Sequence, residues 1–178
     1  MTPSTNQLGP DRGSYPSELL AVAERLLRDG TNTKDEASLR RAVSTAYYAL
    51  FHLLIVQATE NWNQEIDRPI FARLFEHGKM KAACLAIKNA SPQNKNPIPS
   101  FEQRKPPDHM RAVARAFIEA QSQREIADYD LSERISPAEA RIQVELVNGA
   151  FASWAQVRGS TDAHRFLMAL LGTRQDRR

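Results

Sequence analysis

The sequence predicts an all-α fold, an up-down bundle of five to six helices. Several long stretches place apolar residues at every third or fourth position, which is the period of an amphipathic helix. No stretch shows the strict alternation of apolar and polar residues that marks a half-buried strand. The clearest helix start is "SPAE", where Ser136 is the expected cap and Glu139 closes a capping box.

Two helices are expected in the first third of the chain. The first covers residues 16–29, and Gly30 is placed to end it. Thr33 and Glu36 then have the spacing of a capping box, so we expect a second, long helix over residues 34–60.

The middle of the chain predicts a helix, a loop and another helix. Residues 70–90 are expected to be helical with a break near His77 and Gly78, because glycine is a poor helix former. Residues 91–107 hold five of the ten prolines and predict a long surface loop. A helix over 108–129 follows.

The last two helices are expected from the Ser136 cap to about Arg158 and over residues 161–171. At 178 residues the chain is long enough to bury one core. We therefore expect a disordered segment over 1–15, a single helical domain over 16–172 and a charged tail over 173–178.

Composition indicates a soluble protein of the cytoplasm. Hydrophobic residues make up 42% of the chain and charged residues 25%, and the net charge of +3 permits an anionic partner without requiring one. Cys84 is the only cysteine, which excludes an intrachain disulfide and favours a reducing compartment. The N-terminus does not have the pattern of a signal peptide, and His52 interrupts the longest apolar stretch, so we expect no membrane partner.

No metal site and no cofactor are expected. The four histidines are dispersed without the spacing of metal ligands, and no glycine-rich phosphate loop is present. His77 and Cys84 are seven positions apart and could share a helical face as a nucleophile pair. A third member is missing, and Cys84 lies in an apolar context typical of a small buried residue.

Polar residues line one side of the second expected helix. Four of them stand at intervals of four: Arg41, Thr45, Tyr48 and His52. Because the helical repeat is about 3.6 residues, they form one contiguous strip, and Tyr47 flanks it.

The helix over 108–129 carries a matching group at its end. Arg124 and Asp128 are four residues apart and can pair, and Tyr129 lies beside them. These residues could be structural, in a core, a buried polar network or a subunit interface. They could instead bind phosphate or a nucleotide, because arginine presents a planar fork of donors and tyrosine rings stack on bases. We expect four of them to converge in one pocket near a two-fold interface: Arg41, Tyr48, Arg124 and Asp128.

Two stretches together resemble a HEPN domain (higher eukaryotes and prokaryotes nucleotide-binding) of the small single-domain bacterial and archaeal kind. They are "RRAVSTAYYALFHLL" at 40–54 and "REIADYD" at 124–130, followed by a helix introduced by "ISPAEA". The resemblance covers roughly residues 35–158. It implies a helical bundle that forms a face-to-face homodimer. Many members are metal-independent ribonucleases of toxin–antitoxin and defence systems, often paired with a small nucleotidyltransferase.

The active motif of that family is an arginine followed, four to six residues later, by a histidine. Arg124 occupies the position of the arginine, but Asp128 and Tyr129 stand where the histidine is expected. A tyrosine, with an ordinary pKa of about 10, is a poor base at neutral pH, and an aspartate paired with arginine is held as the anion. His52 could serve instead from the neighbouring helix. Arg104 has the nominal spacing to a histidine but lies in the proline loop, so we interpret that match as chance.

Two functions remain open at this stage. The missing histidine favours a HEPN-like module that binds a partner protein, a nucleotide or RNA in the cleft of a homodimer. The alternative is a metal-independent endoribonuclease, the toxin of a system with a nucleotidyltransferase-type antitoxin. A purely structural subunit of a larger assembly is a third possibility. The expected ligand-binding residues are Arg41, Tyr47 and Tyr48, and the expected catalytic residues are Arg124, Asp128, Tyr129 and His52.

Overall fold

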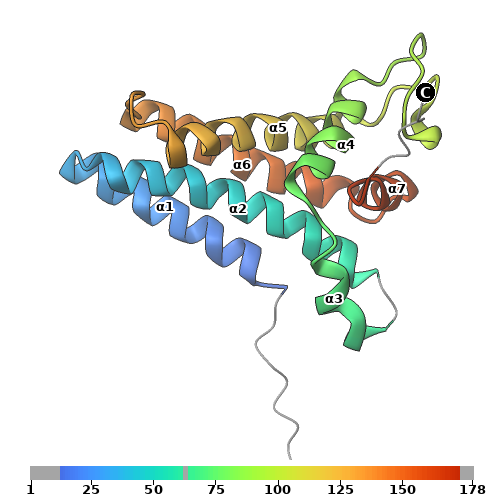
Figure 1. The fold of residues 1–178 in the computed structure, drawn as a ribbon, viewed down its shortest axis with the longest axis horizontal. Coiled ribbons are helices and arrows are strands. Elements are labelled where there is room, and N and C mark those ends of the chain that lie inside the picture. Colours follow the sequence, from blue (N-terminus) through green and yellow to red (C-terminus); the bar gives the residue numbers. More distant parts are fainter. Residues whose placement is uncertain (1–12, 62–63, 173–178) are drawn as a thin grey trace, which may run out of the picture.

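The computed structural model describes residues 13–61 and 64–172, and the regular elements in these ranges are all helical (Figure 1). Seven of them are α-helices, one more than the highest number expected. The additional one is α3, which has five residues. The elements are α1 (Tyr15–Thr33), α2 (Glu36–Glu60), η1 (Glu65–Asp67), α3 (Arg68–Ala72), α4 (His77–Asn89), η2 (Pro99–Phe101), α5 (Asp108–Tyr129), α6 (Pro137–Val157) and α7 (Thr161–Ala169).

Helix α2 is the centre of the bundle. It packs against α1, α5 and α6, and these four long helices run side by side along the molecule (Figure 1). Helices α4 and α7 cover one end, and α3 lies beyond the end of α2. The largest fully buried side chains include Tyr47, Phe117 and Trp154, so aromatic rings from α2, α5 and α6 build the core between them.

The junction between α1 and α2 differs from the prediction. Gly30 does not end α1, and the capping box of Thr33 and Glu36 is wrong, because Thr33 lies inside α1. The carboxylate of Asp35 caps α2 by accepting from two amides of its first turn, at 3.1 and 3.3 Å. Gly30 is needed for close packing: a Cβ there would lie 2.9 Å from the side chain of Leu39.

The region 70–90 also departs from the prediction. The chain leaves the helical conformation at 73–76, before His77, and Gly78 lies in the first turn of α4 without breaking it. A glycine costs little there because the first amides of a helix have no intrahelical partner. The turn 73–76 is held by Phe75, whose side chain is buried.

The proline-rich segment 91–107 is irregular apart from η2, as expected, but it is more than a surface loop. Ile98 and Phe101 are buried in the core. Asn96 fastens the segment to α4 by donating to the carbonyl of Ala86 at 2.8 Å. The loop is therefore packed onto the bundle through these two apolar side chains. Its high proline content alone would not predict this packing.

The second half of the chain follows the prediction closely. Helix α5 has the expected bounds, and the capping box of Ser136 and Glu139 is confirmed. Helix α7 ends at Ala169, two residues before the expected end. The expected terminal segment 1–15 and the charged tail 173–178 lie mostly or wholly outside the described residues.

Within the part of the chain that the structure describes, one helix is long and apolar enough to cross a membrane. It is α2, and 67% of its most apolar window is buried inside the bundle. Core helices of soluble proteins have the same length and composition, so this feature by itself indicates nothing about a membrane.

Candidate functional site

Arg124 occupies the centre of a polar group near the end of α5. Its side chain is only 17% exposed, and its Nε lies 2.8 Å from Oδ2 of Asp128 in an ion pair whose N–H is not aligned for a hydrogen bond. Nη2 donates to the hydroxyl of Tyr48 at 2.6 Å and to that of Tyr129 at 3.4 Å. Burial opposes the charge, but the hydroxyl of Tyr48 and the carboxylate of Asp128 outweigh it and raise the pKa of Arg124.

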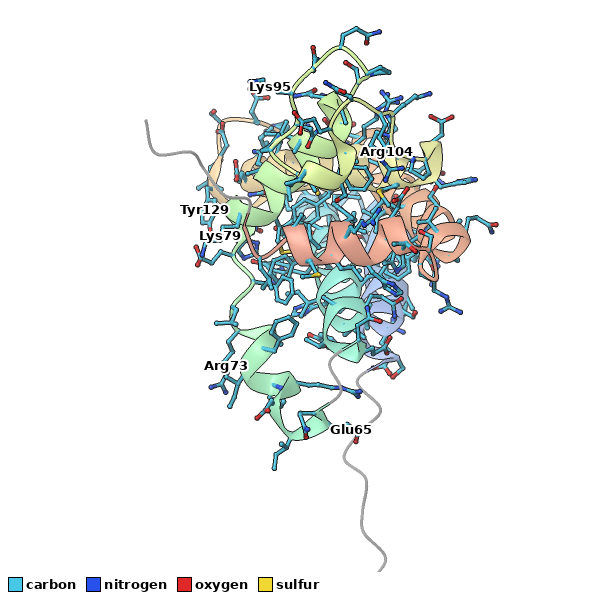
Figure 2. All side chains as sticks on the ribbon, turned by 90° about the vertical axis from the view of Figure 1, so that its right-hand side faces the viewer. Glu65, Arg73, Lys79, Lys95, Arg104 and Tyr129 are labelled. Carbon is cyan, nitrogen blue, oxygen red and sulfur yellow. The ribbon has the colours of Figure 1, made fainter. Side chains whose placement is uncertain are left out.

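Two aromatic rings bracket this guanidinium. Its central carbon lies 5.4 Å from the ring centre of Tyr48 and 5.2 Å from that of Tyr129, both within cation–π range. Tyr48 is half-buried on α2, whereas Tyr129 is 71% exposed. In the end-on view of Figure 2, Tyr129 and Lys79 project from the same side of the bundle. The open side of the arginine therefore carries an accessible aromatic ring.

Asp128 joins α5 to α2. Ser44 donates to its Oδ2 at 3.2 Å, and Nη1 of Arg41 lies 3.8 Å from its Oδ1. Arg41 is 68% exposed, so two guanidinium groups, one held and one free to move, face a single carboxylate. We call these six residues the Arg124 cluster: Arg41, Ser44, Tyr48, Arg124, Asp128 and Tyr129. The structure thus brings together the four residues expected to converge.

His77 extends this polar surface, and sequence reasoning did not connect it to Arg124. Its ring stacks on Phe51 with centres 4.3 Å apart, and its Nδ1 lies 2.5 Å from the hydroxyl of Tyr47. Burial, and secondarily the charge of Arg124, lower the pKa of His77, so the imidazole is neutral at neutral pH. No sequence signal predicts the contact of His77 with Tyr47, because it depends on how the turn 73–76 positions the start of α4 beside α2.

Two expected site residues have other positions. Tyr47 is fully buried against Phe117 and cannot touch a ligand directly, so its assignment as a ligand-binding residue is wrong. It acts on the surface only through His77. The ring contacts of His52 are with Tyr15, Tyr48 and Phe51, and its pKa is lowered by burial first and by His77 second. The charge of Arg124 therefore lowers the pKa of His77, whereas burial and His77 lower that of His52.

Other sequence patterns have structural explanations. Cys84 is fully buried, which raises its thiol pKa far above the usual value and leaves it unreactive. Arg104 bonds the carbonyl of Ser100 and pairs with Asp162, so it fastens the proline loop to α7. Within the described ranges, 13–61 and 64–172, no three His, Cys, Asp or Glu side chains are placed to hold a metal ion.

No protein-family model, curated protein or solved structure matches the chain. The HEPN resemblance therefore stays a prediction carried by the two sequence motifs.

Proposed function

We propose that the Arg124 cluster binds the phosphate backbone of single-stranded RNA. The observation that carries the proposal is the sharing of Asp128 between two arginines: two positive charges face one negative charge. An anion that approaches Arg41 and Arg124 meets a surplus of positive charge and two planar sets of donors suited to phosphate oxygens.

The arrangement also prepares Arg124 for such a ligand. Tyr48 and Asp128 fix its guanidinium before binding, so little side-chain entropy is lost when a phosphate arrives. Arg41 is exposed and can swing from Asp128 to the ligand at small cost, because a surface ion pair is weak. The exposed ring of Tyr129 offers a platform on which a base can stack.

The partners named by the resemblance belong to the same proposal. A homodimer would double the number of clusters and lengthen the path for RNA, and sedimentation of the purified chain would measure its state. A nucleotidyltransferase-type antitoxin partner stays a prediction of the resemblance. A cytoplasmic location stays a prediction from the composition and the single cysteine.

Fluorescence anisotropy of a labelled oligouridine at low salt tests the proposal. Arg124→Met and Arg41→Met are expected to weaken binding about tenfold each, which corresponds to about 1.4 kcal/mol. Arg115→Met is the matched control, because Arg115 is an exposed arginine of α5 outside the cluster; we expect a change below about twofold, as for a distant surface charge. Equal losses for all three variants would mean non-specific attraction to a basic chain.

A second candidate, a metal-independent endoribonuclease, is favoured by His77. In the neutral tautomer whose Nδ1–H donates to the hydroxyl oxygen of Tyr47, Nε2 carries no proton and can act as a general base. It would take the proton of a ribose 2′-hydroxyl, whose oxygen attacks the adjacent phosphorus and displaces the 5′-oxygen of the next nucleotide. That oxygen would take up a proton from water and leave as a hydroxyl. Arg124 would stabilise the charge that develops on the phosphate.

Incubation of RNA with the protein and a metal chelator separates the two candidates. We expect His77→Gln to abolish cleavage while anisotropy still reports wild-type binding, and His52→Gln to retain cleavage. Cleavage that survives His77→Gln would remove the histidine from the mechanism. If the wild-type protein binds RNA but does not cleave it, the endoribonuclease proposal is wrong and only RNA binding is supported.

A further inference from the structure

A separate cavity of about 330 Å³ lies where α2, α5 and α6 meet the loop that joins α5 to α6. Val43, Ile126 and Ile135 supply its apolar surface. None of the residues of the Arg124 cluster lines it. The cavity is therefore a second feature of the same end of the bundle, independent of the function proposed above.

Gln143 of α6 lines this cavity, and its side-chain oxygen lacks a hydrogen-bond donor among the described residues. The residue is only 8% exposed, and within the described part of the chain its Oε1 is buried without a hydrogen-bond partner. A buried amide oxygen without a donor carries the full cost of its lost hydration. A ligand that brings an N–H or O–H donor into the cavity would remove that cost.

Acidic side chains gather at the same cavity. Asp130, Glu133 and Glu139 line it, against one arginine, Arg134. Asp130 and Glu139 each use one carboxylate oxygen locally, on Ser132 and on Ser136, and Glu133 is exposed. Arg40 passes close by, but Glu36 pairs with it at 3.0 Å and offsets its charge. The cavity therefore favours a positively charged ligand.

We propose that this cavity binds a small alkyl diamine. Rotation of the Gln143 side chain would turn its Oε1 toward one ammonium group, which would donate to it, and the methylene chain would lie against the apolar residues. The other ammonium group would meet the carboxylate of Glu133. A ligand with hydrogen-bond donors at both ends and an apolar middle matches the amide, the apolar residues and the carboxylates that line the cavity. An anion would be repelled by the three carboxylates.

Isothermal titration of the full chain with 1,4-diaminobutane tests the proposal. We expect saturable binding at one site, and at least about tenfold weaker binding by Gln143→Met, which keeps the volume and removes the acceptor. Glu133→Gln, an exposed change that leaves the fold intact, is expected to weaken binding severalfold. Glu145→Gln on the exposed side of α6 is the matched control and should not change it.

Circular dichroism of each variant shows whether it folds. Absence of saturable heat with the wild-type protein would overturn the proposal, as would equal affinities for the wild type, Gln143→Met and Glu133→Gln. Should Gln143→Met unfold, the comparison of Glu133→Gln with Glu145→Gln decides alone: equal affinities overturn the proposal.

Discussion

Arg40 and Arg124 are both largely buried arginines near the end of α5, yet their partners differ in kind. Arg40, 13% exposed, donates to the main-chain carbonyls of Ile126, Ala127, Asp130 and Glu133 and pairs with Glu36. Arg124 contacts two tyrosine hydroxyls and one carboxylate. Apart from the carboxylate of Glu36, the first set belongs to the backbone, whereas the second belongs entirely to side chains.

This difference separates a structural arginine from a candidate site. Arg40 donates to the carbonyl of Ala127 in the last turn of α5, which lacks an intrahelical donor, and to two carbonyls of the loop that follows. These bonds tie its guanidinium to the main chain. Side chains hold Arg124 in place, and they do not tie it to the main chain. Burial alone does not mark an arginine as functional; the kind of partner that holds it does.

The largest expected effect is on stability, from Arg40→Met. We expect the free energy of unfolding to fall by about 2–4 kcal/mol, because several part-buried carbonyls lose a donor and the carboxylate of Glu36 loses its ion-pair partner. Urea denaturation monitored by circular dichroism measures this. A loss below about 1 kcal/mol, the range of a surface pair, would contradict the structural role of Arg40.

Tyr48→Phe should have an intermediate effect. The change keeps the ring and removes the hydroxyl that fixes Nη2 of Arg124, so stability should fall by about 1 kcal/mol, the typical net value of one hydrogen bond. RNA affinity should fall with it, because Arg124 is then less well ordered. Unchanged affinity in the oligouridine titration would show that Tyr48 does not prepare the arginine for its ligand.

Arg41→Met should barely change stability while reducing RNA binding. Its pair with Asp128 is long, and Arg41 itself is exposed, so the free energy of unfolding should change by less than about 1 kcal/mol. Urea denaturation measures the stability of this variant, and the anisotropy titration measures its RNA affinity. Together they show whether the two properties change independently. A stability loss as large as that of Arg40→Met would mean that Arg41 is structural as well.

The smallest effect concerns pH. The pKa of His77 in the folded chain lies below its ordinary value of 6.5, through burial and then Arg124, and burial lowers the pKa of His52 in the same way. The unfolded chain therefore binds more protons in this range, so stability is full above about pH 6.5 and falls as pH drops through the lowered pKa.

His77→Gln should flatten this decline of stability between about pH 7 and 5, and Arg124→Met should reduce it. Urea denaturation at a series of pH values measures the slope. A slope that is unchanged in both variants would contradict the electrostatic contact between Arg124 and His77.

Much of the fold could be predicted from local patterns. The bounds of α5 and the capping box at Ser136 follow from residues within one helical turn of each other. The pairing of Arg124 with Asp128 follows from their spacing on one helix. The start of α2 was misplaced because Thr33 and Asp35 are both good caps, and only the path of the chain after α1 chooses between them.

The rest depends on contacts between distant segments. His77 reaches Tyr47 across thirty residues of sequence, and Arg40 reaches the end of α5 across more than eighty. Neither contact has a periodic signature. Ile142 shows the opposite case: it is a large apolar residue of a predicted helix, yet it is exposed. Short-range periodicity predicts which residues share a helix face, but not which helix covers that face.

Nitrogen-15 NMR of the arginine side chains tests the central claim most directly, because it reads both arginines in one titration. On addition of single-stranded RNA, the Nε–Hε resonance of Arg124 should shift progressively and saturate, while that of Arg40 stays in place. Equal shifts of both resonances, or a shift of Arg40 alone, would contradict the assignment of Arg124 as the phosphate-binding arginine.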